Sequence, residues 1–182
     1  MVHNSNTMTS GFTLPRTTRA LVVEEFGAVD KSLKIKDVPT PTPAAGYAII
    51  KVKAFGVNHA EMHMRRGEWA ESMPIIGIEF AGIVVSSIAD SVSPALAPGT
   101  PVVTLMDGLG RTINGSYTEY TEYIGRTING SYTEYTEYTA TPLSNVVPVP
   151  RATVDALGWA RLAVLPETYA TAWTCVFHNL DV

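Results

Sequence analysis

Two stretches decide the expected fold: FGVNHAE at residues 55–61 and MPIIGIEFAGIV at residues 73–84. The first leaves an apolar strand at Gly56 and then presents polar side chains. The second is a turn punctuated by proline and glycine; it holds one carboxylate, Glu79, and runs into a β-branched strand. Polar groups placed after strand ends in this way predict a site built on loops above a β scaffold.

Short strands separated by turn residues account for most of the first 150 residues. Several of them alternate apolar with charged residues, which is typical of half-buried strands. Many short strands with turn signals between them and little helix favour a barrel or a sandwich. The expected strands are residues 19–25, 33–38, 47–55, 80–87, 101–105 and 145–149.

The composition shifts after Pro150. Residues 153–164 are rich in Ala and Leu and are expected to be helical, and Pro166 interrupts this helix. Apolar residues then recur at helical spacing, which gives the last helix a large apolar face that must pack on the barrel or on another domain. These residues are Tyr169, Trp173, Val176, Phe177 and Leu180.

One segment is written twice. Residues 109–123 (LGRTINGSYTEYTEY) are followed at once by residues 124–138 (IGRTINGSYTEYTEY). The pairs Asn114-Gly115 and Asn129-Gly130 predict hairpin turns, because both residue types tolerate a positive φ. Two copies are too few for a solenoid. One hypothesis places one copy in the native strand and the other in an added hairpin or loop. We favour the alternative, a duplication without function.

Composition excludes several classes of protein. With 182 residues, 46% of them hydrophobic, the chain can form one domain with a real core, or one domain and the edge of another. The net charge of −4 argues against nucleic acid and anionic membranes as partners. The single cysteine, Cys175, is expected in the core, and its isolation indicates a reducing, cytoplasmic location. Residues 1–18 could be a transit peptide, because their only charged side chain is that of Arg16. We favour a disordered polar tail, since no apolar helical face appears.

The run His59-Ala60-Glu61-Met62-His63 is the densest group of potential ligands. The two histidines and the glutamate share one face on a strand, whereas on a helix the histidines are four residues apart. Either geometry could hold a metal ion, but ordinary polar loop residues are the favoured interpretation because no thiolate lies nearby. The apolar surroundings of Glu79 predict a raised pKa unless it is paired, with an arginine such as Arg65 or Arg66 or with backbone N–H groups.

Taken together, these residues resemble the medium-chain dehydrogenase/reductase superfamily, and specifically its zinc-lacking, quinone oxidoreductase-like branch. The resemblance covers residues 19–182. The family's G-x-N and G-x-E-x-x-G-x-V elements are similar to residues 56–58 and 77–84. Further similarities lie at Gly67, at residues 98–102 (with Thr100 and Pro101 as departures), at residues 115–120 and at residues 165–173.

The resemblance implies a fold that is mainly β with C-terminal helices, namely a GroES-like, partly open β-barrel. Zinc-dependent relatives carry a cysteine at the position of Asn58 and a histidine at that of Ile78, with a third ligand position mapping near Glu167. An amide and an alkyl group remove most of the affinity for zinc, so the resemblance implies no metal site.

By the same resemblance, a hydride passes from NADPH to a small quinone or enone substrate. Asn58 would lie near the nicotinamide, Thr171 on the other side of the cleft, and His63 would donate to the substrate oxygen. Residues 19–165 are expected to form the catalytic domain. Residues 166–182 would form a helix leading towards a nucleotide-binding domain that this chain lacks. We therefore expect the chain alone to be inactive, and full-length relatives to be homodimers. The alternative is a non-catalytic GroES-like module that binds a partner protein.

Overall fold

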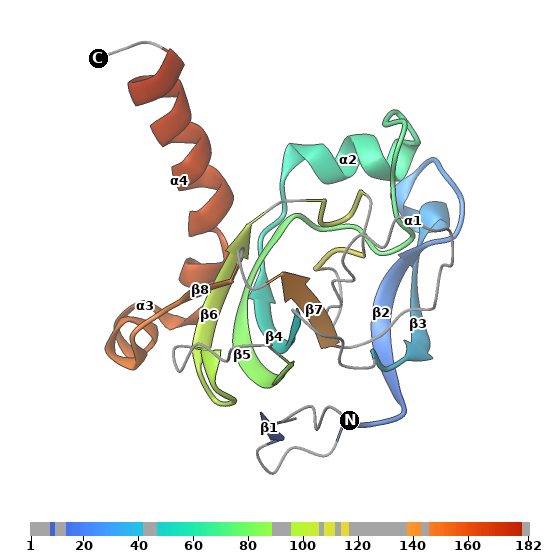
Figure 1. Ribbon diagram of the computed structural model, residues 1–182. Coiled ribbons are helices and arrows are strands. Elements are labelled where there is room, and N and C mark those ends of the chain that lie inside the picture. Colours follow the sequence, from blue (N-terminus) through green and yellow to red (C-terminus); the bar gives the residue numbers. More distant parts are fainter. Residues whose placement is uncertain are drawn as a thin grey trace, which may run out of the picture.

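The computed structural model describes residues 8–9, 14–41, 47–88, 96–105, 108–111, 114–116, 138–142 and 146–179. Within these ranges the strands pair into one large and one small sheet, and helices lie at the sheet margins (Figure 1). No helix in these ranges has the length and apolar character needed to cross a bilayer.

The large sheet has six strands, and five of them follow the order β7-β4-β5-β6-β8, with β1 pairing to β5 off this path. Every pairing is antiparallel. Gly82 allows β4 and β5 to approach closely, because a Cβ there would lie 2.5 Å from the backbone oxygen of Lys51. The strands are β1 (Met8–Thr9), β4 (Tyr47–Phe55), β5 (Glu79–Ile88), β6 (Pro101–Leu105), β7 (Tyr138–Pro142) and β8 (Val146–Pro148).

The small sheet is an antiparallel pair formed by β2 (Thr17–Val23) and β3 (Leu33–Pro39), with the short helix α1 (Val29–Ser32) between them. Its inward side packs with helix α2 (His59–Arg66) and with residues 75–78 in one apolar cluster. This cluster fixes the loop before β5 against α2, so the two stretches that define the site share a core. Its buried members are Ala20, Val38, Met64, Ile75, Ile76 and Ile78.

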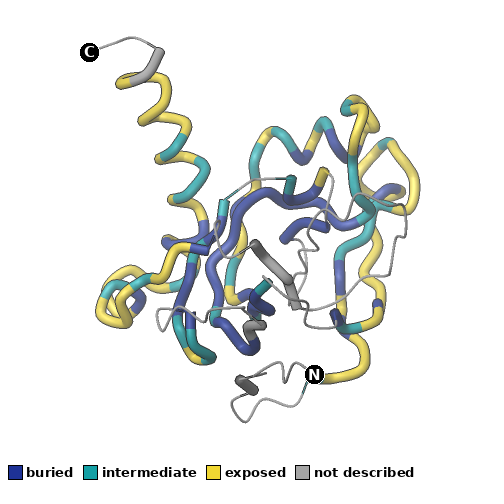
Figure 2. The backbone as a smooth tube through the Cα atoms, viewed as in Figure 1, coloured by how far each residue is buried: buried dark blue, intermediate teal, exposed yellow. Residues whose placement is uncertain are grey.

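The centre of the large sheet forms the main core, which Figure 2 shows as a dark band along the middle strands. Helix α3 (Arg151–Ala163) covers part of this sheet and buries Val154 and Leu162 against Ala81. Its helical path is interrupted at Gly158, where φ is 74° and ψ is 160°.

Helix α4 (Leu165–Trp173) and the π-helical turn η3 (Thr174–Asn179) extend away from the sheets (Figure 1). No residue of α4 is buried. Tyr169, Trp173 and Phe177 are 65%, 53% and 52% exposed and form a ladder of neighbouring rings. The large apolar face expected from the sequence is therefore present, and within the described residues it faces solvent (Figure 2).

The structure confirms a mainly β chain with C-terminal helices. Each of the six expected strands is present, and β4 and β6 have the expected bounds. The barrel is not confirmed, because the pairings among the described residues form two separate sheets rather than a closed ring. Within the expected tail, β1 pairs with β5 and β2 begins at Thr17.

Two local expectations were wrong. Cys175 is exposed instead of buried, because it lies in η3 beyond the part of the chain that packs on the sheets. A positive φ was the expected reason for glycine in the Asn114-Gly115 pair, but Gly115 has no positive φ. Space requires the glycine instead, because a Cβ there would lie 2.2 Å from the backbone oxygen of Gly77. Most of the duplicated segment, including Asn129-Gly130, lies outside the described residues, so both hypotheses about it stay open.

Candidate functional site

Helix α2 begins at the first of the two defining stretches. Asn58 is its N-cap residue, with extended backbone angles of −114° and 162°. The carboxylate of Glu61, in the first turn, accepts a 2.6 Å hydrogen bond from the backbone N–H of Asn58, which is the return half of a capping box. Gly67 ends the helix in the left-handed region at φ 74°. These end signals settle the HAEMH run as a helix.

Glu61 also ties α2 to the second stretch. Its other carboxylate oxygen accepts a hydrogen bond of 3.1 Å from the backbone N–H of Ile78. The side chain is buried, and this burial raises its pKa, opposed in part by the N–H groups that it accepts. One carboxylate thus holds the backbone at both Asn58 and Ile78.

Glu79, at the start of β5, lies at the centre of the site and is 1% exposed. Its Oε1 accepts from Asn58 Nδ2 at 2.9 Å, and its Oε2 accepts from the backbone N–H of Glu167 at 2.8 Å. Burial raises the pKa of Glu79, and the negative charge of Glu167 acts in the same direction. Gly56 makes room for this side chain, since a Cβ there would lie 2.0 Å from Oε1.

The bond to Glu167 brings the first turn of α4 to the sheet. Glu167 follows Pro166 in this turn, and the N-cap residue Val164 provides no side-chain cap. The hydroxyl of Thr171 donates to Glu167 Oε1 at 2.9 Å, one turn further along. Asn58 and Thr171, the two residues expected near the nicotinamide, are therefore joined through Glu79 and Glu167.

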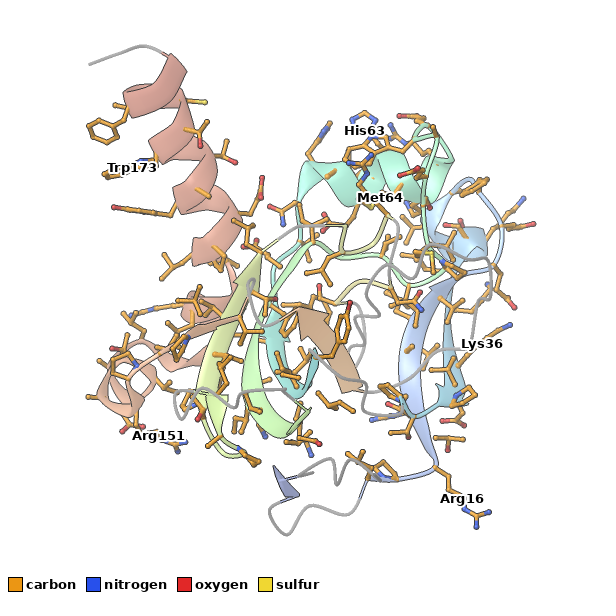
Figure 3. The ribbon with its side chains drawn as sticks, in the orientation of Figure 1. Arg16, Lys36, His63, Met64, Arg151 and Trp173 are labelled. Atoms are coloured by element: carbon orange, nitrogen blue, oxygen red, sulfur yellow. The ribbon has the colours of Figure 1, made fainter. Side chains whose placement is uncertain are left out.

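His63 lies apart from this chain of hydrogen bonds. It is half-buried on the outer side of α2 (Figure 3), and its Nδ1 contacts the carboxylate of Glu68. This contact holds the pKa of Glu68 below its ordinary value. The ring of His63 packs edge-on against that of His59, with centroids 4.8 Å apart. Among the described contacts, none brings His63 to Asn58 or Thr171.

The donor set does not fit a zinc ion. Asn58 uses its amide nitrogen as a donor to Glu79, and the side chain of Ile78 is alkyl and 2% exposed. The carboxylates of Glu61 and Glu79 already accept two N–H groups each. No group of three or more His, Cys, Asp or Glu side chains in the described part of the chain is arranged to hold a metal ion.

Sequence reasoning found Asn58, Ile78 and Glu79, and one of its two alternatives for the partner of Glu79, a backbone N–H group, is confirmed. The other alternative is not supported, because neither Arg65 nor Arg66 has a described contact with Glu79; the amide of Asn58 is its second donor. The role of Glu61 was missed, although Asn at the N-cap with Glu three residues later is a recognisable helix-start signal.

Residues 44–151 match the family model for the alcohol dehydrogenase GroES-like domain. An alcohol dehydrogenase of Moraxella sp. (strain TAE123) is 39% identical over 71 residues, which is 37% of this chain and 20% of that protein. The trans-enoyl reductase ACTTS2 of Alternaria alternata is 35% identical over 86 residues, 47% of this chain and 24% of that protein.

Solved structures give the same result for the fold. An NAD-dependent alcohol dehydrogenase superposes with a TM-score of 0.70 at 25% identity, covering 90% of this chain and 48% of that chain. The quinone oxidoreductase from Coxiella burnetii gives 0.63 at 19% identity, covering 87% and 45%. This chain thus spans about half of each of these solved relatives.

Proposed function

Because this chain belongs to the family of alcohol dehydrogenase GroES-like domains, we propose that it forms the catalytic-domain portion of an NADPH-dependent oxidoreductase. The proposed reaction transfers a hydride to a quinone or an enone. The likeness to an enoyl reductase and to a quinone oxidoreductase supports this substrate class, and the likeness to an NAD-dependent enzyme supports a nicotinamide carrier.

One observation favours reductase chemistry without zinc over alcohol oxidation with it. Residues 58 and 78, where the resemblance places a zinc-binding thiolate and imidazole, are an amide that donates to Glu79 and a buried alkyl side chain. Neither can polarise a substrate oxygen as a metal would. Quinones and enones are already activated for hydride addition, so they need positioning and a proton donor more than a Lewis acid.

NADPH, when bound, would supply the hydride. In the proposed site, Asn58 and Thr171 present hydrogen-bonding groups on either side of Glu79 and Glu167, and Val57 beside them is 76% exposed. Polar groups next to an apolar surface suit a flat ring that carries one carboxamide.

The hydride adds to carbon in an enone or to the quinone system, and its electron pair moves to the substrate oxygen. A proton must then reach that oxygen. We assign this proton to His63, because an imidazole can act as a general acid and His63 lies on the helix that Asn58 caps, with its Nδ1 against the carboxylate of Glu68.

The exposed ladder of Tyr169, Trp173 and Phe177 favours a second candidate function, a non-catalytic module that binds another protein. The two functions differ in what Asn58 does. In the oxidoreductase, Asn58 contributes to turnover, whereas in a binding module its loss affects only stability.

The test uses a fusion protein. Residues 1–182 are joined at their C-terminal end to the part of the Coxiella burnetii quinone oxidoreductase that lies beyond the matched region. We expect the fused protein to oxidise NADPH with a quinone or an enone as the acceptor. A metal chelator should leave the rate of this oxidation unchanged. Asn58→Ala and Thr171→Ala should each lower kcat about 10- to 100-fold, the range expected for misplaced reactants.

His63→Gln should lower kcat by about 100-fold, as for loss of a general acid. Asp155→Asn, on the exposed side of α3, serves as the control and should leave the rate unchanged. Zinc-dependent turnover of an alcohol, or a rate that no substitution at Asn58 alters, would refute the proposal.

A further inference from the structure

The two residues proposed to contact the nicotinamide come from opposite ends of the described chain. Asn58 starts α2, and Thr171 lies in α4, the helix that leaves the sheets. Helix α4 buries no side chain of its own, and apolar packing therefore contributes little to its placement. The first turn of α4 follows directly on the buried end of α3, so contacts at that turn set where Thr171 lies relative to Asn58.

Glu79 provides such a contact. Its two carboxylate oxygens take separate donors, Asn58 Nδ2 at 2.9 Å and the Glu167 N–H at 2.8 Å. Hydrogen bonds to an ionised carboxylate are short and strong. Both bonds are partly buried, and their common acceptor, Glu79, is 1% exposed. The bond to Glu167 caps α4 from another element of the fold, because Val164 supplies no side-chain cap.

The surroundings are shaped for this side chain. Gly56 is buried and leaves the space that the Glu79 carboxylate fills, with contacts so close that even a methyl group would overlap its Cγ, Cδ and Oε1. The backbone N–H of Gly56 also donates to the Glu79 carbonyl at 3.4 Å. A side chain enclosed in this way has one conformation, which is what a positioning group requires.

We propose that Glu79 is a positioning residue that fixes the separation of Asn58 and Thr171, by holding the Asn58 amide with one oxygen and the first turn of α4 with the other. The proposal rests on the assignment of Asn58 and Thr171 to the nicotinamide. It makes Glu79 act through these two residues and gives it no contact with the reacting atoms.

The geometric part is tested on the 182-residue chain without any cofactor. A spin label on the exposed native Cys175, in η3 directly after α4, and a second on Lys53→Cys, in β4, report the distance between the end of this helical segment and the sheet. Glu79→Ala should broaden this distance distribution and speed hydrogen exchange at the Glu167 amide at least about 10-fold, because that N–H loses its acceptor. Asp155→Asn should change neither.

Glu79→Gln is a second variant that keeps the test decisive if Glu79→Ala does not fold. Glutamine keeps the shape but has one acceptor oxygen for two donors, so one of the two bonds is lost. In the fused protein, Glu79→Gln should lower kcat about 10-fold or more with little change in KM for the quinone, since misplacement affects the reacting geometry. The double variant Glu79→Gln/Asn58→Ala should lower kcat no more than the more damaging of the two single variants, because both substitutions act through one contact.

An unchanged distance distribution and unchanged Glu167 exchange in both Glu79 variants would overturn the positioning role, whatever the kinetics show. A changed geometry in a fused protein that transfers no hydride would instead contradict the proposed function and support the role of Glu79 in holding α4.

Discussion

Gly56→Ala is the sharpest test of how the site is assembled. The new Cβ would lie 2.0 Å from Glu79 Oε1, 2.6 Å from its Cδ and 2.8 Å from its Cγ, well inside contact distance. Gly56 has no positive φ, so the alanine backbone itself is unstrained. The whole cost therefore comes from displacing Glu79.

The magnitude follows from what Glu79 loses when it moves. Breaking a hydrogen bond to a charged group costs about 1.5–3 kcal/mol, and overpacking a core costs about 1–3 kcal/mol. With partial relaxation we expect Gly56→Ala to lower the free energy of unfolding by about 2–4 kcal/mol. Urea denaturation followed by circular dichroism measures this value.

A double-mutant cycle isolates the cause. In a Glu79→Ala background the space beside Gly56 is open, so Gly56→Ala should cost less than about 0.5 kcal/mol there. Gly82→Ala is the matched control, because its Cβ would meet the backbone oxygen of Lys51 at 2.5 Å and truncating Glu79 cannot relieve it. Equal costs for Gly56→Ala in both backgrounds would refute the reasoning.

The burial of two carboxylates, the backbone at Gly67 and the exposure of Cys175 each give a further prediction. Burial raises the pKa of Glu61 and Glu79 above the ordinary value of 4.5. Their stabilising contribution is therefore complete below about pH 4.5 and declines as pH rises through the raised values. With Glu79→Gln, the free energy of unfolding from denaturation curves should fall less steeply between about pH 4 and 8 than in the native protein. Equal pH dependence in the two proteins, with only a constant difference in the free energy of unfolding, would contradict this prediction. Gly67→Ala should destabilise the protein by about 1–3 kcal/mol by thermal melting, because φ is 74° and a Cβ would lie 2.7 Å from the Phe26 ring; an unchanged melting temperature would contradict that packing. Cys175 is exposed, so it should react with a thiol reagent within about 10-fold of its rate in the denatured chain, and strong protection would show that α4 and η3 pack elsewhere.

Much of the fold could be predicted from local pattern. The alternation of apolar and charged residues gave β4 with its observed bounds, because a strand facing one core repeats every two residues. The turn at Pro98-Gly99 indicated the start of β6. The nature of the HAEMH run stayed open, since both periods fit so short a segment. Its helix-start and helix-end signals, Asn58 with Glu61 and then Gly67, carried the information that would have decided it.

The sequence by itself determined which groups are available: Asn58 and Ile78 where zinc-dependent relatives have ligands, an acid between apolar residues at Glu79, and an apolar face on the last helix. Only the tertiary structure decided what they do. The bond from Glu167 to Glu79 joins residues 88 positions apart, and it forms because folding buries a carboxylate beside an uncapped helix start. No local pattern encodes that meeting, because it depends on where the chain places α4 rather than on the residues at either end.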